Sequence, residues 1–237
     1  MNIRLHSRLR GVPKHSKRNH RFVKYFCFFA KPCTILAAIN IKNGVHMAQI
    51  FGKFIENFAD RSEYLVLGFS PSSLPIQLRW KTNGLSADFL GDYVRNFFPG
   101  DTSTSLTKQA EIASAVSFIA NELLENAMKY SDESANQPVN LEVHLFNDRL
   151  VFLSKNSVSP KAIRYFQFYI QEIITGDISQ MYIDKVEKSA TNQEEETSGL
   201  GYFTMIMDYN AVLGWKFEEA ESNRHMTMVT TMVQLPI

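Results

Sequence analysis

Residues 105 to 130 constrain the fold most, because their apolar side chains recur at helical spacing over about seven turns. At about 100° per residue, one face of such a helix gathers five apolar residues within a narrow arc. These are Ile112, Val116, Ile119, Leu123 and Ala127. We therefore predict one long helix that packs this face into a protein core.

The stretch NELLENAMKYS, residues 121 to 131, adds polar groups to this helix. Glu122, Asn126 and Lys129 fall on one stripe along the edge of the buried face, where a side chain can face a cleft. The alternative is a solvated face, on which the i, i+4 pair Glu125 and Lys129 adds only a few tenths of a kcal/mol. The spacing alone leaves both interpretations open.

Shorter strands and helices are expected on both sides of this helix. The predicted strands cover residues 64–70, as a short buried strand, 75–82, 139–146, 149–154, 213–220 and 225–235. The predicted helices cover residues 85–98, 161–174 and 200–211. Asn83-Gly84 is expected to close the second strand as a turn, and Asn147-Asp148 to join a hairpin. This mixture of helices and paired strands predicts a layered α+β domain.

Residues 176 to 198 are polar and acidic and lead into Gly199-Leu200-Gly201. We predict a mobile loop there, built around one short helix. The two glycines stand where the loop passes into the next helix. Glycines at such a junction let the backbone approach a ligand closely, and a helix N-terminus offers unpaired N–H groups to a phosphate.

The charge divides the chain into two parts near Met47. Residues 1–46 hold ten of the 25 Lys and Arg residues and no acidic residue, so residues 47–237 carry a net charge of −9. Three interpretations of residues 1–46 stay open: an over-extended start, a basic arm or anchor that is disordered, and a targeting segment. Lys24, Lys31 and Pro32 interrupt its apolar stretch, which argues against a membrane span. Residues 47–237 hold no cysteine, so neither a disulfide nor a cysteine metal site is expected there, which fits a cytoplasmic protein.

Two stretches together resemble a known family. ELLENAMKYS resembles the N-box of the GHKL (histidine kinase-like) ATPase superfamily, and SGLGYFTMIMD resembles its distal glycine-rich box. The resemblance covers roughly residues 105–235. It is closest to the anti-sigma-factor serine kinases, and among these to the SiaB-type protein kinases of bacterial partner-switching systems. It implies a Bergerat-type fold, a two-layer α/β sandwich with a mixed, mostly antiparallel sheet and helices on one face.

The resemblance also implies roles for particular residues. Asn126 would hold the Mg²⁺ that bridges the ATP phosphates, and Glu122 would act as the general base. Lys129 would lie near the phosphates. Gly199, Leu200 and Gly201 would shape the backbone over the phosphate tail, and residues 177–198 would form the ATP lid. Such roles suit phosphoryl transfer, which needs positioning and charge neutralisation more than covalent catalysis.

The sequence departs from the family at one point. After the strand RLVFLS stands KNSVSP instead of Asp-x-Gly-x-Gly, whose aspartate accepts from the adenine amino group. Asn156 is the nearest substitute, and its amide oxygen accepts a hydrogen bond without a charge. The sequence therefore offers a neutral acceptor, and not a carboxylate, for the adenine amino group.

Two functions of different classes follow. The first is an ATP- and Mg²⁺-dependent serine/threonine protein kinase, acting in signal transduction on a small regulatory partner of the anti-sigma-antagonist type. The second is a GHKL-fold binding module that sequesters a regulator with weak catalysis or none. A homodimer is left open. Nucleic-acid binding is not expected, because a domain with a charge of −9 repels phosphate backbones. A histidine autokinase is disfavoured, because neither His144 nor His225 has the Glu and Pro of a phosphoacceptor helix.

Overall fold

The structure is a computed structural model of the whole chain, and it describes residues 35–41, 44–57, 63–70, 76–98, 102–191, 199–220 and 223–237. All of these belong to one compact unit, Cys33–Ile237. In the predicted extension, residues 1–46, the first 34 residues lie outside the described residues. Met47, where the charge changes, lies inside a strand, Gly44–Gly52.

The described strands form one seven-stranded sheet in the order β1-β2-β6-β7-β5-β4-β3. Their bounds are β1 Ile35–Ile41, β2 Gly44–Gly52, β3 Glu63–Phe69, β4 Val139–Leu145, β5 Arg149–Val158, β6 Val212–Ala220 and β7 Asn223–Pro236. Every pairing between these strands is antiparallel, so the prediction of a mixed sheet is wrong for the described residues. Chain-adjacent hairpins, β4–β5 and β6–β7 among them, account for much of this pattern, because a short turn joins only antiparallel strands.

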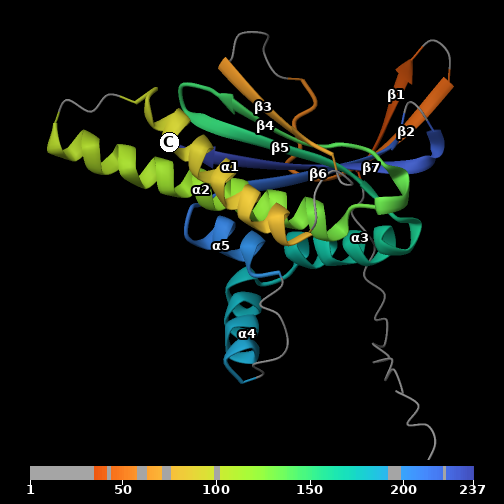
Figure 1. The fold of residues 1–237 in the computed structure, drawn as a ribbon. Helices are drawn as coiled ribbons and strands as arrows, with labels where there is room; N and C mark the ends of the chain where they lie inside the picture. The colour runs from red at the N-terminus through yellow and green to blue at the C-terminus, as the bar shows by residue number, and fades with distance from the viewer. Residues whose placement is uncertain are drawn as a thin grey trace, which may run out of the picture. The chain divides into compact units, whose positions relative to one another are not determined.

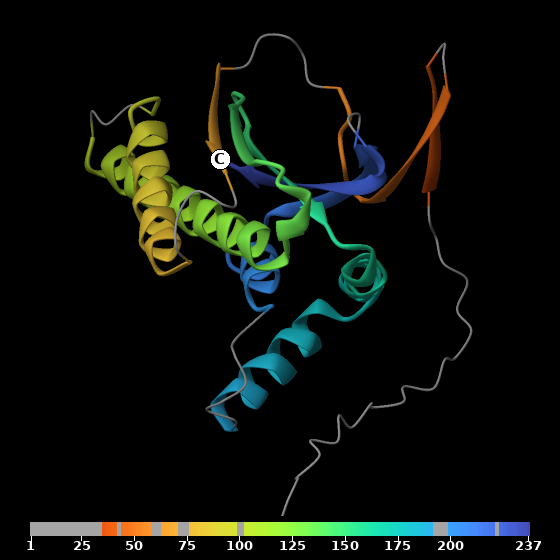
Figure 2. The ribbon, with the colours of Figure 1, turned by 45° about the vertical axis from the view of Figure 1, so that its right-hand side comes forward.

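Among the described residues, five helices accompany the sheet: α1 Ile76–Arg95, α2 Ser103–Tyr130, α3 Pro160–Thr175, α4 Ile178–Thr191 and α5 Gly201–Met207. A short 3₁₀ turn, Glu133–Ala135, follows α2. Helices α1, α2, α3 and α5 lie on one face of the sheet, whereas α4 points away from it (Figures 1 and 2). The fold is therefore α+β with two layers, as the sequence predicts.

The long helix α2 is the centre of the core. All five residues of its predicted apolar face are buried, which confirms that prediction. The helix begins at Ser103, two residues before the predicted start, because Thr102 caps it. Thr102 Oγ1 accepts from the Ser105 N–H at 3.2 Å, and Ser105 Oγ accepts from the Thr102 N–H at 2.9 Å. This reciprocal pair is a capping box.

The predicted strand over residues 75–82 is wrong, because α1 takes in residues 76–82, the described part of this stretch, and also the predicted Asn83-Gly84 turn. The alternation of Ile76, Leu78 and Trp80 suggests a strand, but a helical pattern also passes through these residues. The buried positions 83, 87, 90 and 94 of α1 follow helical spacing, and in the sequence Ile76 and Trp80 stand at the same spacing. Asn83 is buried in this row, and its Nδ2 donates to Met128 Sδ at 3.3 Å, so it serves helix packing instead of a turn.

The other predicted elements are present with small shifts. The strand from Tyr64 exists as β3, but it lies at the edge of the sheet and is not buried, with Tyr64 62% exposed. Helix α3 covers the predicted 161–174, and α5 begins at Gly201 within the predicted 200–211. The polar segment 176–198 contains a helix of 14 residues, α4, and residues 192–198 lie outside the described residues.

Candidate functional site

A cavity of about 320 Å³ opens between the helices and the sheet. Its lining comes from the C-terminal end of α2, the strands β5 and β7, the helix α3 and the junction that begins α5. Four of the predicted site residues line this cavity: Asn126, Asn156, Gly199 and Gly201. These residues come from three separate stretches of the chain, and the fold brings them to one place. The volume is at the lower end of the range for small-molecule sites.

The sheet side of the cavity carries polar groups. Along β5, the residues that face the helices are Leu150, Phe152, Ser154, Asn156 and Val158, so two polar residues interrupt an apolar row. In the antiparallel register, Ser154 stands opposite Thr231 and Asn156 opposite Val229 of β7. Ser154, Asn156 and Thr231 are all buried, so the cavity has a polar floor beneath apolar walls.

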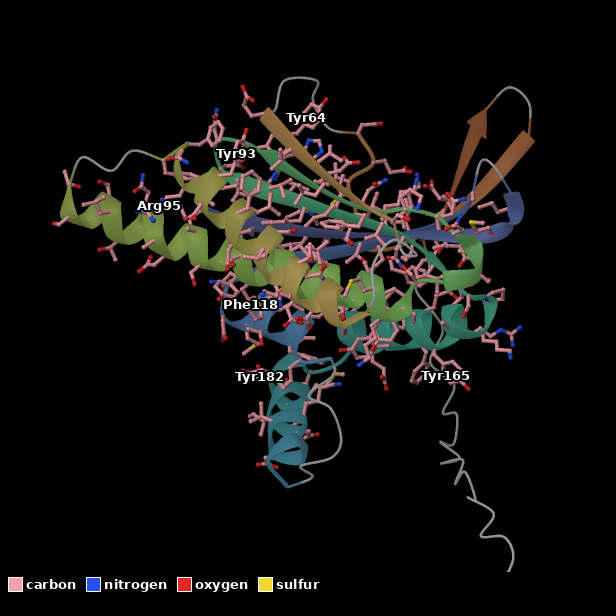
Figure 3. The ribbon with its side chains drawn as sticks, in the orientation of Figure 1. Tyr64, Tyr93, Arg95, Phe118, Tyr165 and Tyr182 are labelled. Carbon is pink, nitrogen blue, oxygen red and sulfur yellow. The ribbon has the colours of Figure 1, made fainter. Side chains whose placement is uncertain are left out.

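Aromatic side chains make the walls of the cavity. Tyr165, Phe166 and Tyr169 come from α3, Tyr130 from the end of α2, and Tyr202 from α5. Tyr165 is 75% exposed on the outer side of α3, where Figure 3 labels it, and therefore marks the solvent side of the cavity. Aromatic rings provide flat apolar surface for a planar ligand group.

Tyr169 connects α3 to the glycine-rich junction. Its hydroxyl donates to the carbonyl oxygen of Gly199 at 2.8 Å. Burial raises the pKa of Tyr169, so the phenol stays protonated and keeps its donor. The ammonium group of Lys185 on α4 lies over the Tyr169 ring, 5.2 Å from its centroid. These contacts place part of α4 beside the junction.

Gly199 occupies a backbone conformation that favours glycine, with φ +100°. A Cβ at this position would lie 3.0 Å from Lys185 Nζ and 3.1 Å from the hydroxyl oxygen of Tyr169. The junction therefore requires glycine here both for its backbone angle and for its close contacts.

Glu122 does not line the cavity but lies next to it. Its side chain packs against Gly201, where an added Cβ would overlap Oε2 and lie 2.8 Å from Cδ. Burial, and after it the nearby Glu125 carboxylate, raises the pKa of the Glu122 carboxyl above its ordinary value of 4.5. Glu125 itself accepts from Asn121 Nδ2 at 2.7 Å. A carboxyl group with a raised pKa beside a cavity is suited to proton transfer.

The two remaining predicted residues stand outside the lining. Lys129 is exposed, and its Nζ lies over the Tyr130 ring, 5.8 Å from the centroid. Leu200 is half-buried, and its carbonyl oxygen accepts from the Thr204 N–H at 2.9 Å in the first turn of α5. Leu200 therefore contributes its backbone carbonyl to the first turn of α5. Lys129 lies next to Tyr130, which lines the cavity, but does not line the cavity itself.

Sequence reasoning did not single out Ser154, Thr231 or the tyrosines of the walls. One sequence feature could have found Ser154. In this strand the core-facing positions are otherwise apolar, and two neighbouring core-facing positions are polar. Such a pair indicates that a binding site adjoins the core there. The tyrosines carry no comparable pattern, because aromatic residues at helical spacing are common in ordinary cores.

Comparisons with models of protein families and with curated proteins found no match for this chain. Among the residues that the structure describes, no helix is long and apolar enough to cross a membrane.

Proposed function

We propose that this protein is an ATP-dependent serine/threonine protein kinase of the GHKL type. One observation carries the proposal: Asn126, Asn156, Gly199 and Gly201, which the resemblance assigns to nucleotide binding, line a single cavity. Its aromatic walls fit a planar base, and its volume fits the nucleoside part of a nucleotide. The two-layer α+β fold supports the finer assignment to the Bergerat type.

Each residue has a separate task in this proposal. The base enters between the tyrosines, with its polar edge toward Ser154 and Asn156. The carboxamide oxygen of Asn126 is a suitable ligand for Mg²⁺, an ion that commonly binds through one or two protein groups together with substrate phosphates. Bound Mg²⁺ would neutralise charge on the phosphates. Gly199 and Gly201 let the backbone of the junction pass close to them.

Glu122 supplies the proton acceptor. When a serine or threonine hydroxyl of the partner attacks the γ-phosphorus, a new O–P bond forms and the bond to the bridging oxygen of ADP breaks. The hydroxyl proton passes to the Glu122 carboxylate, and ADP leaves with the electron pair of the broken bond. The raised pKa of Glu122 brings the carboxylate closer to the pH at which a general base is most effective.

The partner in this proposal is a small regulatory protein of the anti-sigma-antagonist type, in the cytoplasm of a bacterium. This assignment rests on the resemblance of residues 105–235 to the SiaB-type kinases. The acidic residues of the segment 177–198 belong to the proposed lid, of which α4 is the described part.

We also propose a homodimer, with its contact on α1. The outer face of this helix exposes Leu85, Phe89 and Phe97, and the rings of Tyr93 and Phe97 lie 5.2 Å apart. Figure 3 labels Tyr93 and Arg95 on this helix. Light scattering should give a dimer for the wild type and a monomer for Phe89→Asp; a wild-type monomer at high concentration would refute the dimer.

The kinase is tested by phosphate transfer from Mg·ATP to serine or threonine residues of its purified partner. We expect transfer by the wild type, loss with Asn126→Ala and strong reduction with Glu122→Gln. The family's Asp-x-Gly-x-Gly is replaced in this chain by the sequence around Asn156. This difference favours the binding module as the second function. If the wild type binds the partner tightly but never phosphorylates it, the binding module is correct and the kinase is not.

A further inference from the structure

Within the described part of the chain, one hydroxyl group on the polar floor of the cavity has no hydrogen-bond partner. Ser154 Oγ is buried and has no hydrogen bond within the part of the chain that the structure describes. Its two polar neighbours differ. Asn156 Nδ2 donates to the Ser157 carbonyl at 3.0 Å, and the Thr231 side chain hydrogen-bonds to the Tyr202 hydroxyl. A buried polar atom that stays unpaired costs stability, so its presence in a cavity wall calls for a partner from outside the chain.

The groups on this floor are neutral and can change roles. A serine hydroxyl both donates and accepts, and an asparagine amide has an oxygen that accepts and a nitrogen that donates. The described residues that line the cavity include no Asp, Glu, Lys or Arg. A carboxylate would only accept, and would therefore require a donor on the ligand. The floor of Ser154 and Asn156 makes no such requirement.

We infer that the cavity does not select adenine over hypoxanthine, and that Ser154 contacts the six-membered ring edge of the base. This inference rests on the proposed function, because it takes the cavity to be the base site. Adenine presents an amino donor and a ring-nitrogen acceptor at this edge. Hypoxanthine presents the opposite pair, a carbonyl acceptor and a ring N–H donor. Ser154 and Asn156 can pair with either arrangement by turning the hydroxyl or by using the other end of the amide.

The test compares Mg·ATP with Mg·ITP on the full chain by calorimetry, because these nucleotides differ only at that edge. We expect dissociation constants within about tenfold of each other, since each base finds neutral hydrogen bonds of similar strength. If ATP binds and ITP binds more than about a hundredfold more weakly, the floor is selective and the inference is wrong. If neither nucleotide binds, the proposed function fails, and the inference falls with it.

Asn156→Asp is a gain-of-selectivity test. A carboxylate at this position accepts from the adenine amino group and repels the carbonyl oxygen of hypoxanthine. The preference for ATP over ITP should therefore rise by at least about tenfold, because charge-assisted hydrogen bonds are roughly twice as strong as neutral ones. An unchanged ratio in a folded variant would show that residue 156 does not contact the base edge, and would overturn the inference.

Ser154→Ala separates ligand contact from structural support. Removing a hydroxyl without a protein partner should leave the melting temperature of the free protein unchanged or higher. The affinities for ATP and ITP should both fall about two- to tenfold. Ser157→Ala is the matched control, because Ser157 is buried on the same strand, donates to the Asp132 carbonyl and lies outside the cavity lining. This control should leave both affinities unchanged. Unchanged affinities in Ser154→Ala would contradict the contact.

Discussion

The carboxyl group of Glu122 lies directly against the backbone of Gly201, so that a methyl group added at residue 201 would overlap Glu122 Oε2. Glu122 is on the long helix α2, and Gly201 is the first residue of α5. The proposed general base and the glycine-rich junction therefore share one contact. Side-chain freedom at Glu122 depends on the absence of a side chain at residue 201.

Gly201→Ala should displace the Glu122 carboxyl group. The clashing atoms are the end of a flexible side chain, so the free energy of unfolding should change by no more than about 1 kcal/mol. Phosphate transfer should fall toward the level of Glu122→Gln, and the double variant should be no slower than Glu122→Gln alone. Gly84→Ala is the control, because a Cβ at residue 84 meets no atom within 4 Å. Full additivity of the two rate losses would show that the residues act independently.

The pH dependence of transfer should report on Glu122. The base must be ionised, so the rate should rise with pH through a pKa above the ordinary 4.5 and should then level off. Glu122→Gln should lose this rise and about 10²–10⁴ of the rate, with Mg·ATP affinity nearly unchanged. A glutamine variant that transfers at the wild-type rate would refute the assignment of the base.

The free energy of unfolding should also depend on the ionisation of Glu122, and the direction of this dependence is fixed. The folded pKa of Glu122 is raised, so between the unfolded and folded pKa values the folded state binds more protons. The free energy of unfolding should therefore decrease as the pH rises through this window. Denaturant unfolding at several pH values measures this, and in Glu122→Gln the decrease should be smaller. An identical pH profile in both proteins would mean that Glu122 is not perturbed by burial.

Helix α4 should open readily in the free protein and close over bound nucleotide. It points away from the sheet and has Ile183 and Val186 exposed, and its apolar contacts with the core come from Ile178, Met181 and Tyr182 in its first half (Figure 2). Hydrogen exchange of residues 178–191 should be fast without ligand and slow with Mg·ATP, whereas α2 should stay protected in both states. Equal exchange of α4 in both states would argue against a lid.

A chain that starts at Met47 should fold by itself. Such a chain lacks β1, which pairs with β2 alone, and keeps the residues of β2 that pair with β6. The core of α2 and the central strands stays complete, so the melting temperature should match that of the full chain. Loss of a cooperative thermal transition would show that residues 1–46 belong to the folding unit.

The sequence correctly predicted those parts of the fold whose apolar residues fit only one pattern, either helical spacing or strand alternation. The apolar face of α2 and the hairpins β4–β5 and β6–β7 carry such patterns. Residues 75–82 fit two periodicities at once, and the packing of α1 on α2 decides between them. The strand β3 has a strand pattern, but its edge position, and hence its exposure, depends on the arrangement of the whole sheet.

The candidate site was partly predictable for a related reason. Asn126, Asn156, Gly199 and Gly201 stand in short stretches that have a pattern of their own, and the fold brings them to one cavity. Thr231 becomes a site residue only through the register of β5 with β7, which sets it opposite Ser154 and which no local pattern fixes. Its role follows from pairing between strands that are distant in sequence.

Binding of Mg·ATP to the cavity tests the account most directly. Calorimetry should show saturable binding of Mg·ATP to the wild type. Asn126→Ala should weaken it at least about tenfold, since the loss of a charge-linked contact typically costs 1.5 kcal/mol or more. Asn121→Ala is the control, because Asn121 lies on the same helix, bonds to Glu125 and does not line the cavity; its affinity should equal that of the wild type. No binding to the wild type at millimolar Mg·ATP, or equal affinity in Asn126→Ala, would contradict the account.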